Sequence, residues 1–249
     1  MRILQKTEQW LTQILEHGNT LDSDIIAKAY DQAMDSWLDR ALLKLRAKSF
    51  NPRYLAKHIE KLAKQPTGEI TCLDVGCNIG AKTNLILEIL KSLGCSKVAF
   101  HGIDLSEKAI AIIKKSNKHS NATYKVADFL TMNLKEDSYD YIFLTAVWHH
   151  IKDQEEAIKK IEKALKPGGL GIIFNGFYPE NIVLRIPSLL LQKFYRLIVK
   201  RNGLRYTKPL ISSIEKLVSK KCKKLKFLGN FSTGFPTNIL NTRMLILTK

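Results

Sequence analysis

The sequence predicts an α/β protein with a doubly wound, mostly parallel sheet. Between residues 69 and 175, short apolar runs alternate with amphipathic helical segments, and a glycine turn follows the first of these runs. The chain has 249 residues, 45% of them hydrophobic, which is enough to bury one full core. We therefore expect a single elaborated α/β unit with appendages.

The N-terminal segment, residues 1–65, is predicted to form a helical cap. Its apolar residues recur at spacings of three and four, as at Trp37 and Ala41. The run from Gln65 to Gly68 is a turn signal, and we expect the main domain to occupy residues 66–249.

The elements of the main domain follow in a regular order. Strands are expected at 69–75, 97–104, 122–126, 139–145 and 170–175, with helices at 81–93, 106–118 and 153–165. Such alternation favours parallel strands with helices on both faces. The last third is expected to hold an apolar and basic insertion at 176–208, a helix at 209–222 and strands at 225–233 and 240–248. Because no helix crosses between these last two strands, they should pair antiparallel.

A glycine turn at the end of the first strand is the main functional motif. It reads Leu73-Asp-Val-Gly-Cys-Asn-Ile-Gly80 and leads into a helix whose first N–H groups have no partner within the helix. Asp104 ends the next strand, where a carboxylate can accept hydrogen bonds from both hydroxyls of a ribose. The loop lacks the GxGxxG fingerprint of NAD sites, so these residues indicate another adenosine-containing cofactor.

These residues resemble motif I of the class I methyltransferases that use S-adenosylmethionine (SAM), usually written [DE]xGxGxG. That family has a seven-stranded sheet of order 3-2-1-4-5-7-6 with strand 7 antiparallel. Asn78 replaces the middle glycine, a modest departure because Asn tolerates left-handed backbone. The resemblance implies cofactor contacts from motif I and from the end of the second strand: Asp74, Gly76, Cys77, Asn78, Gly80, Asp104 and Leu105.

Three further segments match the family by position. Asp128 and Phe129 resemble its adenine site, where the carboxylate accepts from the exocyclic amine and the neighbouring side chain packs on the ring. Residues 145–151 resemble the segment that faces cofactor and acceptor, which assigns Thr145 to the cofactor. Residues 165–170 resemble the turn before the fifth strand.

The paired histidines and two cap residues complete the predicted site. His149 or His150 could act as general base if the acceptor must lose a proton, and we select His150, although one of them is equally explained as packing the helix start. In the cap, Tyr30 is a candidate to close over the cofactor, and Arg53 could pair with its carboxylate; both are equally explained as helix surface or turn.

The insertion and the net charge bear on the acceptor. Residues 182–199 are too charged to span a bilayer but apolar enough to lie on one, and ubiquinone-pathway O-methyltransferases look similar here. The net charge is +17, and residues 177–249 hold 15 lysines and arginines against two acids. We expect a small, apolar or aromatic acceptor methylated on oxygen or nitrogen, with peripheral contact to an anionic membrane. The alternatives are RNA, a non-catalytic SAM-binding protein, and a basic surface that only aids solubility.

The remaining composition narrows the setting. The four cysteines show no zinc or disulfide spacing, so we expect reduced thiols and no metal. The N-terminus is polar and lacks the apolar core of a secretory signal, and the expected location is the cytoplasm.

Overall fold

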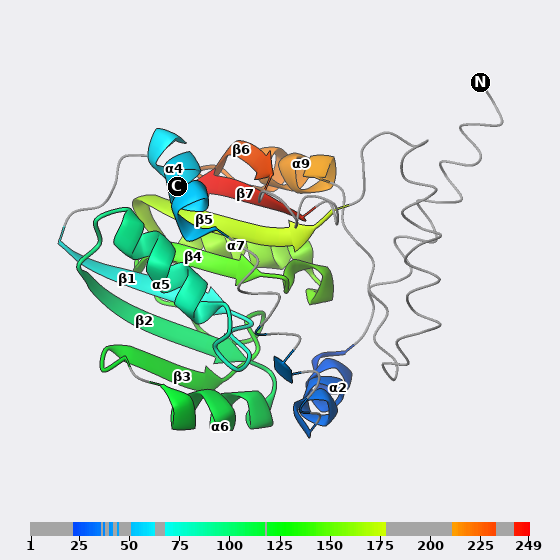
Figure 1. The fold of residues 1–249 in the computed structure, drawn as a ribbon. Helices are drawn as coiled ribbons and strands as arrows, with labels where there is room; N and C mark the ends of the chain where they lie inside the picture. The colour runs from blue at the N-terminus through cyan, green and yellow to red at the C-terminus, as the bar shows by residue number, and fades with distance from the viewer. Residues whose placement is uncertain are drawn as a thin grey trace.

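The fold is built around one seven-stranded sheet (Figure 1). In the computed structural model, residues 22–35, 37, 40, 41, 44, 51–62, 68–117, 119–177, 211–232 and 242–249 are described. Their strand order is β3-β2-β1-β4-β5-β7-β6, the order predicted. The strands are β1 (Glu69–Val75), β2 (Lys97–Asp104), β3 (Ala122–Val126), β4 (Tyr139–Thr145), β5 (Leu165–Gly176), β6 (Lys226–Ser232) and β7 (Thr242–Thr248).

Strand direction also agrees with prediction. The pairs β1·β2, β1·β4, β2·β3 and β4·β5 are parallel, and β7 pairs antiparallel with both β5 and β6. The first five strands therefore end at one common edge of the sheet, hereafter the carboxyl edge. Ligands of open α/β sheets bind outside this edge.

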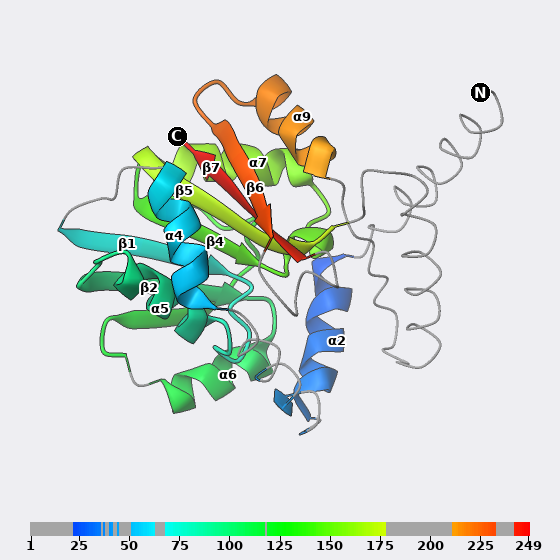
Figure 2. The same ribbon diagram turned by 45° about the horizontal axis from the view of Figure 1, so that its top comes forward.

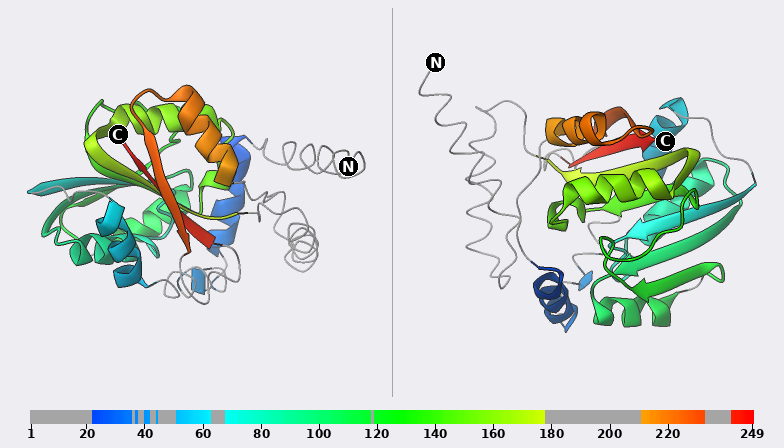
Figure 3. Two further views of the ribbon diagram at one scale, coloured as in Figure 1. Left: turned by 90° about the horizontal axis from the view of Figure 1, so that it is seen from above. Right: turned by 180° about the vertical axis from the view of Figure 1, so that it is seen from behind.

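Helices cover both faces of the sheet, as Figure 3 shows from above. One apolar cluster joins the sheet to α4 (Pro52–Leu62), α5 (Thr83–Ser92) and α6 (Glu107–Ser116), and the other joins it to α7 (Gln154–Ala164) and α9 (Ile211–Lys221). All seven residues of β4 are buried, as expected for a central strand covered on both faces. The sheet is thus a rigid platform for groups at its carboxyl edge.

The fifth strand is longer than predicted. We expected a turn at Pro167-Gly-Gly169 and a strand from Leu170, but β5 begins at Leu165. Leu165 pairs with Tyr139 and Leu170 pairs with Tyr141, so the intervening residues form an irregularity within the pairing rather than a turn before it. A proline and two glycines fit there because the regular ladder is interrupted.

A separate helix, α2 (Ser23–Asp35), lies at the carboxyl edge (Figure 2). It packs mainly against α6. The predicted domain boundary near residue 65 lies outside the described residues, as do nearly all of the predicted insertion at 176–208 and the whole of residues 182–199. In the part of the chain that is described, no helix has the length and apolar character needed to cross a membrane.

Candidate active site

The glycine turn after β1 is fixed against the end of β2. The N–H groups of Gly76 and Cys77 donate to the carbonyl oxygen of Ile103 at 2.8 and 3.0 Å. Gly76, Asn78 and Gly80 have φ values of 75°, 49° and 78°, so all three adopt left-handed backbone. Asn78 therefore occupies the conformation that we expected it to tolerate in place of glycine.

Both glycines also permit close approach of neighbouring segments. A Cβ atom at Gly80 would lie 2.6 Å from Cδ1 of Ile113, and one at Gly76 would lie 2.9 Å from Cγ2 of Val147. Any side chain at these positions would push α6 or the loop after β4 away from the turn. These two positions therefore require glycine for close packing as well as for backbone conformation.

Asp104 stands at the end of β2 with both carboxylate oxygens directed by backbone donors. Oδ2 accepts from the N–H of Asn78 at 2.8 Å, and Oδ1 accepts from the N–H of Ser106 at 2.9 Å. Burial raises the pKa of this carboxyl, and N–H bonds from Ser106, Asn78 and Leu105 oppose that rise. Because a carboxylate offers about four acceptor positions, these contacts leave it capacity to accept from a ribose hydroxyl.

Asp128 lies at the next strand end. Its Oδ1 accepts from the N–H of Leu130 at 2.8 Å, and its Oδ2 accepts from the hydroxyl of Ser23 in α2 at 2.5 Å. Phe129 is 5% exposed and belongs to the apolar cluster on the α7 face. The carboxylate is held in place, and the phenyl ring forms part of the core next to it.

Asp74, the acid of the motif, is fully buried. The hydroxyl of Thr83 donates to its Oδ2 at 3.1 Å, while its Oδ1 has no hydrogen-bond partner in the described structure. Burial raises the pKa of Asp74 to about 7, Asp104 adds to the rise, and Thr83 and Lys82 oppose it. The motif thus contains a carboxyl that changes charge near neutral pH.

The segment after β4 turns sharply and presents the two histidines. Ala146 has a φ of 56°, and Trp148–His150 form the 3-10 helix η1. Nε2 of His150 lies 2.9 Å from the hydroxyl of Tyr30 in α2. Burial, the neighbouring imidazole of His149 and the ammonium of Lys82 lower the pKa of His150 well below 6.5. Its imidazole is therefore neutral at neutral pH.

His149 is oriented from β5. Its Nδ1 lies 2.8 Å from Oδ1 of Asn175, whose Nδ2 donates to the carbonyl oxygen of Gly176 at 2.9 Å. Because the amide nitrogen is used in this way, its oxygen accepts, and Nδ1 of His149 carries the proton. The rings of His149 and His150 are 4.0 Å apart between centroids.

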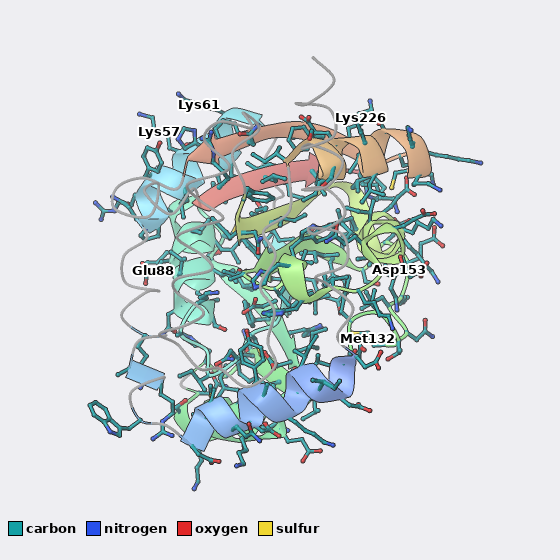
Figure 4. The ribbon with its side chains drawn as sticks, turned by 90° about the vertical axis from the view of Figure 1, so that its right-hand side faces the viewer. Lys57, Lys61, Glu88, Met132, Asp153 and Lys226 are labelled. Atoms are coloured by element: carbon teal, nitrogen blue, oxygen red, sulfur yellow. The ribbon has the colours of Figure 1, made fainter. Side chains whose placement is uncertain are left out.

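The α2 helix bridges several parts of this edge. Besides Ser23 and Tyr30, its Asp31 Oδ1 accepts from the hydroxyl of Ser106 and from the N–H of Lys108, at 2.5 and 3.1 Å. Asp35 forms an ion pair with Lys108 at 2.7 Å. Figure 4 views the molecule from the side on which α2 crosses the strand ends.

The structure therefore brings together most of the predicted residues. Motif I, Asp104, Leu105, Asp128, Thr145, the two histidines and Tyr30 surround the carboxyl edge. Thr145 is buried, its carbonyl oxygen accepts from the ammonium of Lys82 at 2.9 Å, and its hydroxyl has no hydrogen-bond partner among the described atoms. Arg53 is exposed in the first turn of α4, which packs on α5, so it stands apart from this group.

Two polar residues of the edge were not singled out from the sequence. Lys82 contacts Thr145, and Asn175 orients His149. Asn175 could have been found because it is a polar residue at the carboxyl end of an apolar parallel strand. Asp31, which joins α2 to α6, belongs to the cap segment Tyr30-Asp-Gln that was predicted to close over the cofactor.

Comparison with known proteins agrees with this geometry. Residues 73–173 match the family model described as "Methyltransferase domain". The tRNA N(3)-methylcytidine methyltransferase of Schizosaccharomyces pombe is 31% identical over 217 residues, which cover 81% of this chain and 67% of that enzyme. Phosphoethanolamine N-methyltransferase 2 of Caenorhabditis elegans is 36% identical over 106 residues, 41% of this chain, and the chain spans only 23% of that relative's length.

A solved structure shows the same fold. The Haemonchus contortus Phosphoethanolamine N-methyltransferase 2 in complex with S-adenosyl-L-methionine superposes with a TM-score of 0.54 at 19% identity, covering 79% of this chain and 52% of that one. The residues of motif I and Asp104 suit such a cofactor, since the glycine turn leads into a helix start and the half-buried carboxylate of Asp104 keeps acceptor capacity for a ribose hydroxyl.

Proposed function

Because this chain belongs to the class I SAM-dependent methyltransferases, we propose that it methylates a nitrogen or oxygen atom of a small-molecule acceptor bound beside His150. The observation that carries the proposal is the half-buried, neutral imidazole of His150, held 2.9 Å from the Tyr30 hydroxyl at the end of β4. A neutral imidazole at this position can accept a proton.

The cofactor is assigned to the carboxyl edge in this proposal. Asp104 accepts from the ribose hydroxyls, Asp128 accepts from the adenine amine, and the turn Gly76–Gly80 packs against the cofactor backbone. Thr145 and Tyr30 face it from β4 and α2, whereas Arg53, exposed on α4 and apart from this group, is left out of the assignment. Support comes from the fixed carboxylates of Asp104 and Asp128, each held by a backbone N–H.

The protein has little chemistry to add, because bound SAM supplies an already activated methyl group. Placement of the nucleophile in line with that group accounts for much of the rate. We propose that His150 receives the proton which the acceptor loses and that the Tyr30 hydroxyl orients the imidazole. The α2 helix, attached to three separate loops, excludes water from this position.

The acceptor itself is proposed to be a small apolar or aromatic metabolite bound at the edge that holds His149 and Asn175. The substrate lid predicted at residues 176–208 lies almost wholly outside the described residues. Contact of residues 182–199 with an anionic membrane stays a prediction, tested by sedimentation with anionic vesicles and by Leu189→Glu with Leu190→Glu.

Radiolabel transfer tests the proposal. Purified protein is incubated with methyl-labelled SAM and with either the small-molecule or the RNA fraction of a cell extract. We expect label in the small-molecule fraction, and His150→Ala should lower the turnover by about 10²–10⁴-fold while SAM affinity holds. Transfer at the wild-type rate by His150→Ala would remove His150 from the chemistry, and label confined to RNA would overturn the acceptor class.

RNA is the second candidate, and a surface of α4 and β6 favours it. The ring of His58 stacks on Phe231 at 4.7 Å and meets Tyr54 edge-on at 4.6 Å. Lys57 and Lys61 flank this stack on α4 (Figure 4). Burial lowers the pKa of His58 most, and the two ammonium groups lower it further. Aromatic rings beside cations suit single-stranded nucleic acid. The relative that matches most of this chain is named as a tRNA methyltransferase.

A further inference from the structure

Arg243 lies at the start of β7, next to the acceptor side of the carboxyl edge. In the antiparallel pairing it stands directly opposite Asn175 of β5 and, on its other side, opposite Ser232 of β6. Asn175 is the residue that orients His149. A single cross-strand step therefore separates Arg243 from the histidine pair.

The pleat of the sheet places Arg243 and Asn175 on the same face. Along β7, Met244 belongs to the apolar cluster on the α5 face and Leu245 to the cluster on the α7 face. Because side chains alternate, Arg243 shares the α7 face with Leu245, and Asn175 shares it with Ile173 in the same way. Side chains directly opposite in an antiparallel pair have Cβ atoms about 5 Å apart.

One nitrogen of the Arg243 guanidinium lacks a hydrogen-bond partner. The side chain is half-buried, its Nε is buried and has no hydrogen-bond acceptor among the described atoms, and no hydrogen bond or ion pair joins the side chain to another described residue. Burying a charged donor without an acceptor is unfavourable, so this arrangement favours an anionic ligand.

Three lysines elsewhere in the described structure have ion-pair or hydrogen-bond partners for their ammonium groups. The ammonium of Lys249, whose side chain is 4% exposed, pairs with Asp137 at 2.5 Å, and that of Lys166 pairs with Asp140 at 2.7 Å. Lys160 donates to the carbonyl oxygens of Leu130 and Met132. The unsatisfied Arg243 Nε thus lies at the edge where the ligand binds, whereas Lys166 and Lys249 lie at the opposite edge.

We propose that Arg243 binds an oxyanion, a carboxylate or phosphate group, on the methyl acceptor. This inference rests on the proposed function and narrows it: the acceptor is an anionic small molecule whose charged end lies beside β7 and whose nucleophilic atom lies beside His149 and His150. A guanidinium fork matches either oxyanion with two parallel hydrogen bonds. The net charge of +17 would raise the local concentration of such an acceptor.

Anion binding by the protein saturated with S-adenosylhomocysteine tests the inference. Inorganic phosphate and acetate are titrated by calorimetry into the wild type, Arg243→Met, Arg243→Lys and Lys114→Met, the last removing an exposed lysine of α6. We expect one of the two anions to bind the wild type and Lys114→Met equally, about tenfold more weakly to Arg243→Met, and with intermediate affinity to Arg243→Lys. Binding of phosphate alone indicates a phosphorylated acceptor, and binding of acetate indicates a carboxylate.

The inference fails if neither anion binds the wild type, or if Arg243→Met binds as well as the wild type. Should Arg243→Met not fold, as judged by its thermal transition, equal affinities of the wild type and Arg243→Lys would also overturn it. Failure of the proposed function gives a different result, because S-adenosylhomocysteine would then not bind the wild type. The phosphate and acetate titrations, repeated on the protein without S-adenosylhomocysteine, would still measure anion binding by Arg243.

Discussion

At the scale of single residues, two titratable groups of the site, His150 and Asp74, have pKa values shifted in opposite senses. Burial lowers the pKa of His150 and raises that of Asp74, because in each case the charged form is the one that loses solvation. Near neutral pH the imidazole is therefore uncharged, and the carboxyl is close to half ionised. Each shift leads to a prediction.

The His150 imidazole should titrate below pH 6.5 in the folded protein. We expect an NMR titration of its ring protons to show a midpoint well below 6.5. Tyr30→Phe removes the hydroxyl near Nε2 but keeps the histidine, so the His150 signal can still be assigned. This variant is a second probe of the contact between Tyr30 and His150. A midpoint at or above 6.5 in the cofactor-free protein would contradict the buried environment.

Asp74 should make stability fall as pH rises. Its folded pKa of about 7 exceeds the unfolded value of 3.8, so the folded state holds more protons between these values. The contribution of the protonated Asp74 carboxyl to the free energy of unfolding is complete below pH 3.8 and is lost as pH rises through 7. Its upper limit is about 4 kcal/mol. Asp74→Asn should lack this dependence. Denaturant unfolding of the wild type and Asp74→Asn at pH 5 and pH 8 measures this dependence. If the free energy of unfolding changes by the same amount in both proteins, Asp74 is ionised throughout.

The sequence predicted correctly the backbone conformation and position of several residues, while their roles in binding stay predictions. Gly76, Asn78 and Gly80 were predicted from a turn that needs left-handed conformations, and Asp104 from its place at a strand end. Asn175 and Arg243 were not singled out. Their importance depends on which strands become neighbours at the end of the sheet, and that pairing joins residues far apart in the chain.

At the scale of elements, α2 is the part of the cap that reaches the site. Its contacts extend from Asp128 to His150 and to the start of α6, and they are polar and partly exposed. Elements held by such contacts open more readily than core strands. A helical cap was predicted from apolar periodicity, but periodicity could not show which loops its polar face would meet.

We predict that the cofactor slows amide hydrogen exchange in Ser23–Asp35. Asp31→Ala removes the acceptor for Ser106 and Lys108, so it should speed exchange in α2 and raise the dissociation rate of S-adenosylhomocysteine by several-fold. Glu88→Ala, which removes an exposed acid on α5, is the matched control and should change neither. Identical exchange in all three proteins would mean that α2 does not cover the ligand.

Strand and helix positions were predicted to within a few residues except at β5. There the proline and two glycines indicated a turn, whereas pairing of Leu165 with Tyr139 extends the strand through them. Local composition favours a turn at such a sequence, and only the long-range ladder with β4 overrides it.

At the scale of the whole molecule, strand order and direction were predicted because one motif fixed the family. The resemblance of motif I implied the order in which the strands pair, which composition and periodicity do not contain. The excess of positive charge in residues 177–249 was also evident from the sequence. Which surface that charge covers depends on packing, and only residues 211–232 and 242–249 of the basic part beyond Phe177 are described.

The central assignment is that the cofactor binds at the carboxyl edge around Asp104. Calorimetric titration of S-adenosylhomocysteine into the wild type and Asp104→Ala tests it directly, with Glu88→Ala as a control for loss of an exposed acid elsewhere. We predict micromolar binding to the wild type and the control. Loss of two charge-assisted hydrogen bonds, each worth about 1.5–3 kcal/mol, should weaken binding to Asp104→Ala at least a hundredfold. Equal affinity of Asp104→Ala and the wild type would contradict the assignment.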